Sequence, residues 1–327
     1  KKMNYLITGG AGFIGSHLVE KLLAEGHGVT VLDNLSTGTN ENITSFTGNE
    51  AFEFNLGSIL NAELVDTLVS KCDQVYHLAA AVGVKYIMEN PVETIRTNTI
   101  GTENILHSCS HYMKKVMIAS SSEVYGKAMR LKSGSDGLDE ESETVYGSTR
   151  IKRWSYATSK ALDEFLALAY YHERNLPVVI IRLFNTVGPR QLSNYGMVIP
   201  IFVRKALSGE PLPVFGDGSQ QRSFTYIGDV VEAMVKIMDC AQAEGQVINI
   251  GNENEITIDE LAQLIVTKSG SESKIVHISY EKAYGIGFED MARRKPDITK
   301  LKNLINFEPT LEIGEVIEKV IDYYRAM

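Results

Sequence analysis

The chain has 327 residues, of which 44% are hydrophobic and 22% are charged, as is ordinary for a soluble globular protein. Its length allows one large domain or two closely associated ones. The net charge of -9 argues against a general nucleic-acid binder and against adhesion to an anionic membrane. No apolar run approaches the ~20 residues of a membrane span, and no signal peptide is visible in the first residues.

The cysteines and histidines give no sign of a metal site. Cys72, Cys109 and Cys240 are far apart and odd in number, which is typical of reduced thiols, and the seven histidines form no cluster. We therefore expect a cytoplasmic protein that binds no metal, nucleic acid or membrane.

Short apolar runs alternate with longer helical patterns in the first half of the chain, as in a parallel sheet with crossover helices. A helix is expected at 13–24, after a glycine-rich turn, and a longer one carries Tyr156 and Lys160. The predicted strands are nearly all apolar, as expected when helices cover both faces of a sheet. They lie at 5–7, 29–33, 52–55, 74–78, 116–119 and 178–183.

The pattern changes after residue 184. Glycine and proline recur through 185–228, which we expect to be rich in loops. The later predicted elements are a helix at 229–241, a strand at 247–250, a helix that begins with a capping box of Thr257 and Glu260, and an amphipathic helix at 312–324.

These patterns together predict an α/β fold. We expect a doubly wound parallel sheet of the Rossmann type, formed by 1–184 with about 229–252 returning to it. A smaller, interleaved substrate domain would be formed by 185–228 and 253–327.

The turn after the first predicted strand is a candidate cofactor site. Gly9, Gly12 and Gly15 lie where the backbone must approach a pyrophosphate closely and where a helix N-terminus supplies unpaired N–H groups. Glycine turns of this kind also occur where a strand simply packs against a helix, so the three glycines alone do not establish a cofactor site. Asp33 ends the second strand, and a carboxylate there accepts hydrogen bonds from both ribose hydroxyls and repels a 2′-phosphate. We predict NAD rather than NADP; the alternative for Asp33 is a solvated acid at a strand end.

Tyr156 and Lys160 are the candidate catalytic pair. Four residues apart on a helix, they share one face. The ammonium would stabilise a phenolate, so a phenol with a free pKa of about 10 could act as a base near neutral pH. Ser121, at the carboxyl end of the fifth strand, could bind the oxygen that Tyr156 deprotonates. The alternatives are that the spacing of Tyr156 and Lys160 arose by chance and that Ser121 belongs to a simple serine-rich turn.

The order of these motifs resembles that of the short-chain dehydrogenase/reductase superfamily, and over nearly the whole chain it resembles the extended branch that modifies nucleotide sugars: 4-epimerases, 4,6-dehydratases and UDP-glucuronate decarboxylases. The later markers are the segments Leu183-Phe184-Asn185, Pro213-Val214-Phe215-Gly216, Arg222-Ser223-Phe224 and Arg294-Lys295-Pro296-Asp297. The resemblance implies NAD contacts from Gly9, Gly12, Phe13, Ile14, Gly15, Asp33, Asn34, Leu78, Ala79, Ala80, Asn98, Tyr156 and Lys160.

The resemblance also implies a UDP-linked sugar as substrate. Asn185 and Arg222 would hold the diphosphate and its ribose, Arg294 would pair with the phosphates, and Val214 and Phe215 would line the base pocket. Arginine suits this work because its planar fork binds phosphate oxygens bidentately. Without the family resemblance, Arg222 and Arg294 would be interpreted as ordinary surface residues. A homodimer is implied as well, through helices at about 92–111 and 155–174.

Ser122 and Glu123 discriminate within the branch, in which dehydratases carry Asp-Glu at this place and decarboxylases carry Ser-Glu. Glu123 is thereby implied to handle a proton at sugar C5 once C4 has become a ketone. The segment Tyr156-Ala157-Thr158-Ser159-Lys160 departs from the Tyr-Asp-Glu-Gly-Lys of many decarboxylases. The sugar therefore stays open, as does the choice among decarboxylation, 4,6-dehydration and C5–C6 double-bond migration or reduction.

The leading hypothesis is an NAD-dependent enzyme that oxidises C4 of a UDP-hexose, an N-acetylhexosamine derivative included, before chemistry at C5. A UDP-hexose 4-epimerase is one alternative, and a non-catalytic NAD-binding sensor or scaffold is another. The polar insert at 127–153 reads best as a solvated loop that could still contact the sugar. Within it, the Tyr146 and Arg150 pair mimics the catalytic spacing, and the adjacent Trp154 could pack or bind a ligand.

Overall fold

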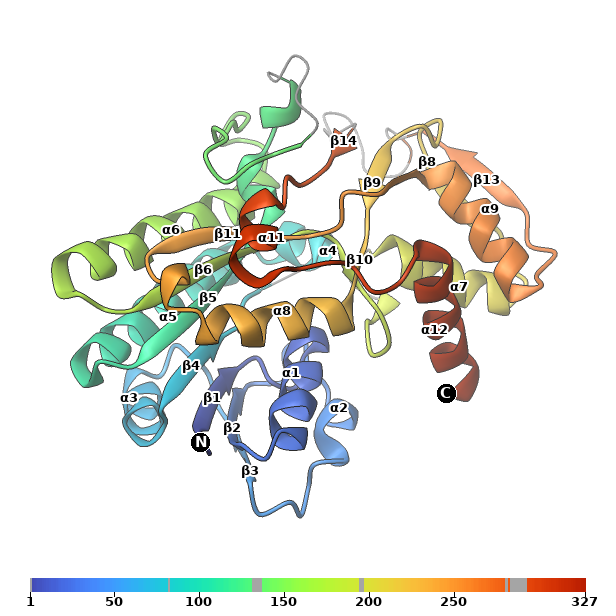
Figure 1. Ribbon diagram of the computed structural model, residues 1–327. Helices are drawn as coiled ribbons and strands as arrows, with labels where there is room; N and C mark the ends of the chain where they lie inside the picture. The colour runs from blue at the N-terminus through green and yellow to red at the C-terminus, as the bar shows by residue number, and fades with distance from the viewer. Residues whose placement is uncertain (1, 82, 131–136, 194–196, 280–281, 283–292) are drawn as a thin grey trace.

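The computed structural model describes residues 2–81, 83–130, 137–193, 197–279, 282 and 293–327 (Figure 1). At its centre lies a seven-stranded sheet in which every neighbouring pair is parallel. The strand order is β11 (Gln246–Ile250), β6 (Val178–Leu183), β5 (Lys115–Ser121), β4 (Gln74–His77), β1 (Asn4–Thr8), β2 (Gly28–Asp33) and β3 (Phe52–Leu56). The predicted α/β, doubly wound class is confirmed.

Helices cover both faces of this sheet because successive strand residues point to opposite sides. Tyr5 and Ile7 of β1 pack into the core under α1 (Phe13–Ala24) and α8 (Ile227–Asp239). Leu6, between them, packs into the core of the other face. That face is covered by α3 (Ala62–Lys71), α5 (Pro91–Tyr112) and α6 (Trp154–Arg174), as Figure 1 shows.

A second lobe has a hydrophobic core of its own. It packs α7 (Val198–Leu207), α9 (Ile258–Ser269) and α12 (Ile313–Ala326) with the strand pair β8 (Leu212–Phe215) and β13 (Ile275–Ile278). The capping box predicted at Thr257 and Glu260 is confirmed at the start of α9. The other α-helices and strands of the described residues are α2 (Glu41–Thr44), α4 (Val84–Glu89), α11 (Thr299–Ile305), β7 (Thr186–Val187), β9 (Gln221–Ser223), β10 (Thr225–Tyr226), β12 (Glu255–Thr257) and β14 (Arg293–Arg294).

The expectation that 185–228 would be mainly loops is wrong for α7. Ile199, Phe202 and Val203 recur at helical spacing and are buried in the second lobe. Pro200 lies in the first turn of α7, where backbone N–H groups have no partner within the helix, so the proline does not interrupt it. Reading proline as a loop signal concealed this helix.

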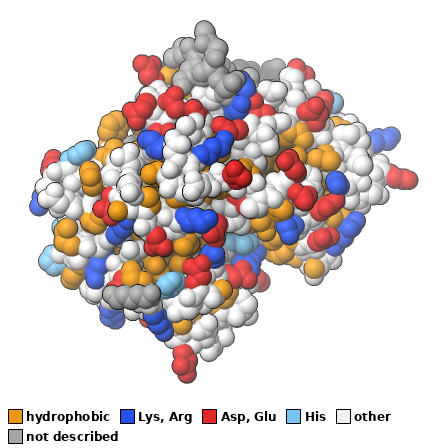
Figure 2. Space-filling model, viewed as in Figure 1, with side chains coloured by type: hydrophobic (Ala, Val, Ile, Leu, Met, Phe, Trp, Pro, Cys, Tyr) orange, Lys and Arg blue, Asp and Glu red, His pale blue; other side chains and the backbone are white. Residues whose placement is uncertain are grey.

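The topology brings the carboxyl ends of the parallel strands to one edge, which faces the second lobe (Figure 1). On the face drawn in Figure 2, acidic and basic side chains are interspersed. None of the helices in the described part of the chain has the length and apolar character needed to cross a membrane.

Candidate active site

A cleft of about 1090 Å³ runs along the carboxyl edge of the sheet, between the strands and the second lobe. Nearly all the residues predicted for the cofactor and substrate line this one cleft. They are Gly9, Gly12, Phe13, Ile14, Gly15, Asp33, Asn34, Leu78, Ala79, Ala80, Ser121, Ser122, Glu123, Tyr156, Asn185, Phe215, Arg222 and Arg294.

Three predicted residues lie behind its wall. Val214 is buried in the core of the second lobe, so only its neighbour Phe215 reaches the cleft. Asn98 supports the wall: its Oδ1 accepts from the N–H of Ala81 (2.9 Å), and its Nδ2 donates to the Ser159 hydroxyl (3.1 Å). Lys160 is buried beneath Tyr156 on the same helix.

The glycine turn has no room for side chains at two of its positions. A Cβ on Gly15 would lie 2.1 Å from the carbonyl oxygen of Gly9, and a Cβ on Gly9 would lie 2.8 Å from the backbone nitrogen of Ala79. Gly9 also has a φ of +75°, which favours glycine. Helix α1 begins after Gly12, which has no side chain to cap it, so its first N–H groups can meet an anion.

Asp33 is fixed beside this turn. Its Oδ2 accepts from the N–H of Ala11 (2.9 Å) and its Oδ1 from the N–H of Leu35 (2.8 Å). Burial raises the pKa of the Asp33 carboxyl, and these backbone donors oppose the rise. The close glycine turn and a carboxylate at the end of β2 fit a dinucleotide whose adenosine ribose carries free hydroxyls.

Tyr156 and Ser121 meet at the floor of the cleft, where the Ser121 hydroxyl hydrogen-bonds the phenol. Burial raises the pKa of Tyr156, while the Lys160 charge and the Ser121 hydrogen bond oppose the rise. Lys160 is itself paired with Asp163, with 3.0 Å between Nζ and Oδ2. The lysine alone therefore does not give Tyr156 the low pKa that the Tyr–Lys spacing led us to expect.

Glu123 lies between two arginines at this end of the cleft. Its Oε1 is 2.7 Å from Nη2 of Arg294, and its Oε2 is 3.6 Å from Nη2 of Arg153. Arg294 also donates from Nη1 to the Ser122 hydroxyl (3.3 Å). Arg294, which the family resemblance assigned to the phosphates, thus lies against the Ser122–Glu123 pair.

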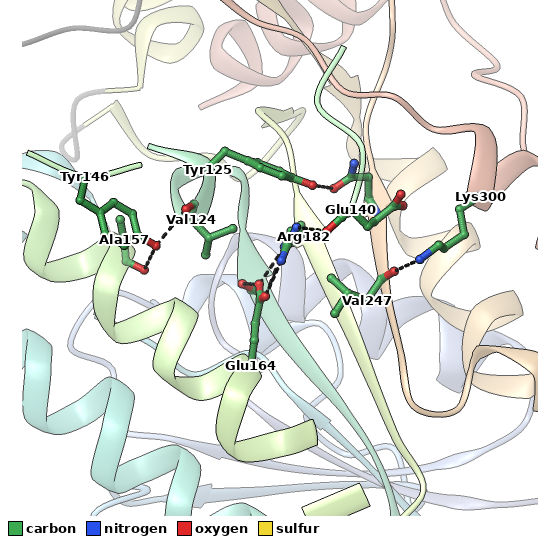
Figure 3. A network of polar contacts seen from close by, with 11 residues as sticks. Val124, Tyr125, Glu140, Tyr146, Ala157, Glu164, Arg182, Val247 and Lys300 are labelled. Atoms are coloured by element: carbon green, nitrogen blue, oxygen red, sulfur yellow. Dashed lines mark hydrogen bonds and ion pairs between the residues drawn. The ribbon is translucent and has the colours of Figure 1, made fainter. Parts of the chain in front are cut away.

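Arg153 and Tyr146 are site residues that the sequence did not indicate. Arg153 lines the cleft. The Tyr146 hydroxyl donates to the Val124 carbonyl (2.9 Å) and lies 3.5 Å from the Ala157 carbonyl, so it ties the segment after Glu123 to the helix of Tyr156 (Figure 3). Both residues belong to the insert predicted as a solvated loop, whose residues 131–136 lie outside the described part. Trp154 is buried against Tyr146, as in a packing role.

The site defines a class of enzyme in which a tyrosine moves a proton while a bound nicotinamide cofactor moves a hydride. The family described as GDP-mannose 4,6 dehydratase matches residues 6–320. The UDP-N-acetyl-alpha-D-glucosaminuronate decarboxylase of Bacillus cytotoxicus is 46% identical over 327 residues, covering 100% of this chain and 99% of the relative. UDP-glucuronic acid decarboxylase 1 of Xenopus tropicalis is 38% identical, covering 98% of this chain and 72% of the relative.

Among solved structures, the UDP-glucuronic acid 4-epimerase of Bacillus cereus, in complex with UDP-glucuronic acid and NAD, superimposes with a TM-score of 0.87 at 30% identity, covering 99% of both chains. The chain belongs to the extended short-chain dehydrogenase/reductase family, in its nucleotide-sugar epimerase, dehydratase and decarboxylase branch. It is an NAD-dependent enzyme of this nucleotide-sugar-modifying type.

We predict that Asp33→Ala weakens NAD binding about 10- to 100-fold, because hydrogen bonds to a charged group are lost, and that it narrows the preference for NAD over NADP. Calorimetric titration with each dinucleotide measures both effects. Asp33→Asn is the matched control, because it keeps the size of the side chain and removes only the charge. A wild-type protein that already prefers NADP would contradict this role.

Proposed function

We propose that the protein decarboxylates a UDP-linked hexuronate, with UDP-N-acetylglucosaminuronate as the favoured substrate. The observation that carries the proposal is the placement of Glu123 between Arg294 and Arg153, next to Tyr156. Two arginines supply the charge and the planar donors that hold a sugar carboxylate. Glu123 supplies a group that can transfer a proton at the neighbouring carbon.

The reaction follows from these positions. Tyr156 takes the proton of the C4 hydroxyl, and Ser121 orients that oxygen. The glycine turn and Asp33 would hold NAD, which would supply the acceptor and later the donor of the C4 hydride and would be unchanged overall. With a ketone at C4, the C6 carboxylate belongs to a β-keto acid.

The bond between C5 and C6 then breaks. CO2 leaves, and the electron pair remains as an enolate over C5 and the C4 oxygen, near Ser121 and Tyr156. Glu123 takes up a proton from solvent and passes it to C5, and Tyr156 returns its proton to the C4 oxygen as the ketone is reduced.

Two relatives of this chain that carry decarboxylase names support the proposal, and the more similar of them is named for an N-acetylated hexuronate. A second candidate, 4-epimerisation of a UDP-hexuronate, is favoured by the similarity to the Bacillus cereus epimerase. We also propose that 1–184 and 229–252 hold the cofactor while 185–228 and 253–327 hold the nucleotide sugar. The three free cysteines support a cytoplasmic site of action.

The test is incubation of the NAD-loaded enzyme with UDP-N-acetylglucosaminuronate, UDP-glucuronate, UDP-glucose and UDP-N-acetylglucosamine, followed by NMR of the products. We expect CO2 release and incorporation of one solvent deuteron at C5 with the uronates, the N-acetylated one first, and no decarboxylation of the neutral sugars. A product epimeric at C4 that keeps its carboxylate would establish the epimerase. A cofactor that stays oxidised with every sugar would indicate a non-catalytic protein.

Glu123→Gln separates the two halves of the reaction. Because the amide keeps the shape but cannot accept a proton, we expect product formation to fall ~10²- to 10⁴-fold while C4 oxidation persists. Absorbance of reduced cofactor, with NMR detection of a 4-keto sugar, measures the accumulation. Tyr156→Phe is the matched control, since it should bind NAD and substrate without reducing the cofactor. Full activity of Glu123→Gln without C5 exchange would leave 4-epimerisation as the better account.

We further propose a homodimer built on α5 and α6, which pack side by side on one face of the sheet. Val92 on α5 is 70% exposed and Phe165 on α6 is 73% exposed. The other large apolar side chains exposed on these helices are Ile95, Ile100 and Leu162. A second copy placed over these helices would cover the patch.

We predict that Phe165→Glu gives a monomer at micromolar concentration, because a charge would be buried in the interface without a partner. Sedimentation velocity measures the mass. Val276→Glu is the control, because Val276 is an exposed apolar residue on β13 in the other lobe. A monomeric wild-type protein would contradict the dimer.

A further inference from the structure

A buried ion pair lies directly behind the catalytic tyrosine. The Nζ of Lys160 is 3.0 Å from Oδ2 of Asp163, and their side chains are only 2% and 1% exposed. A lysine this deeply buried is unfavourable as an ammonium unless an opposite charge compensates the lost hydration. Asp163 supplies that charge from one turn further along α6.

The next residue, Glu164, is held by another cation. Arg182 on β6 binds it through Nε and Nη2, with 2.7 Å between Nη2 and Oε2. The Ser120 hydroxyl donates to the same carboxylate. The two neighbouring acids thus divide their roles, Glu164 pairing with Arg182 and Asp163 pairing with Lys160.

Polar side chains continue from Asp163 toward the cofactor turn. The Thr102 hydroxyl faces Asp163 and favours the ionised carboxyl, which lowers its pKa against the effect of burial. Thr102 Oγ1 is 3.0 Å from Nε2 of His77, and Nδ1 of His77 is 2.7 Å from Oγ1 of Thr8. Thr8 ends β1, just before Gly9, and its hydroxyl accepts from the N–H of Ala79 (3.2 Å).

An ionised Asp163 fixes the direction of this chain. A carboxylate only accepts, so the single proton of Thr102 points to Asp163. Thr102 then accepts from Nε2–H of His77, and Nδ1 of His77 accepts from Thr8. Neutral His77 satisfies this arrangement, and burial lowers the pKa of His77 to about 3.

We propose that Asp163 is a positioning residue that keeps Lys160 protonated and in place beneath Tyr156. The proposal concerns the proton-transfer pair itself and is independent of which sugar is the substrate. Among the described residues, Oδ1 of Asp163 has no hydrogen-bond partner and Oδ2 accepts from Nζ of Lys160 (3.0 Å), so Lys160 is the main partner of this carboxylate.

The charges around Lys160 and Tyr156 show in which direction the loss of Asp163 would shift the pKa values of these two residues. Burial lowers the pKa of Lys160, but the charges of Asp163, Tyr156 and Glu164 outweigh it and raise the pKa above its ordinary value. Tyr156 faces Lys160, Glu123 and Asp163, of which only the lysine favours the phenolate. Removing the Asp163 charge therefore lowers the pKa of Lys160, and a Lys160 that loses its proton no longer favours the phenolate, so the pKa of Tyr156 rises.

The first test is a spectroscopic titration of Tyr156 in the NAD-loaded protein. Tyrosinate absorbance is followed against pH, and the curve of the same protein carrying Tyr156→Phe is subtracted. We expect Asp163→Asn to shift the Tyr156 midpoint upward by about one pH unit, because a lysine without its counter-charge no longer stabilises the phenolate, and we expect Asp163→Glu to restore it toward the wild-type value. Asp229→Asn, which removes a buried carboxylate bonded to Thr310 elsewhere, should leave the midpoint unchanged. An unchanged or lowered midpoint in Asp163→Asn would mean that Lys160 stays protonated without Asp163, and it would overturn the proposal.

A double-mutant cycle, which compares free energies of unfolding, tests the proposal even if Asp163→Asn folds poorly. If Asp163 acts through Lys160, Asp163→Asn destabilises the wild-type protein, because it strands a buried ammonium. The same substitution stabilises the Lys160→Met protein, because it removes a stranded carboxylate. Urea unfolding of the four proteins measures this reversal of sign. Equal destabilisation in both backgrounds would reduce Asp163 to a packing residue and overturn the proposal.

Discussion

The bond between Arg182 and Glu164 is the constraint on which the active site depends, because it fixes α6 to the sheet. Arg182 projects from β6, binds Glu164 of α6, and donates from Nη1 to the Glu140 carbonyl of the insert (3.0 Å) (Figure 3). Its guanidinium also lies over the ring of Tyr125, 4.7 Å from the centroid. A buried arginine with this many partners allows little movement of the helix, and Tyr156 and Lys160 are carried by that helix.

The charges in the cleft show why the net charge of the chain did not predict its ligands. The protein carries a net charge of -9, yet Arg153, Arg222 and Arg294 all line the cleft. Acids such as Asp33 and Glu123 line the cleft as well, so the positions of the individual arginines decide where an anionic group could bind. The net charge of the chain therefore bears on non-specific binding, and the arginines of the cleft bear on the binding of a nucleotide sugar.

Local signals in the sequence predicted the elements and residues that depend on local geometry. The apolar strands, the capping box at Thr257 and the glycine turn are each fixed by residues within one short segment. The helix α7 was missed because Pro200 was read as a loop signal and because many residues that pack against its apolar face, those of α9 and α12, lie far along the chain. The same reason applies to Arg153: its partner Glu123 lies thirty residues earlier, across an insert without strong periodicity.

Two groups of charged residues lie near Tyr156, one buried beneath it and one in the cleft beside it. Their difference in solvent exposure bears on which step of the reaction each group affects. Lys160 and Asp163 are buried, so solvent cannot screen them, and they act on Tyr156 whatever sugar is bound. Glu123, Arg153 and Arg294 line the cleft, where a substrate carboxylate would meet them directly. A change in the second group would thus act first on the part of a substrate that meets it, and the Glu123 charge also bears on the Tyr156 phenol. A change in the first group would alter every reaction that begins by removing the C4 proton, because each of them requires the same phenolate.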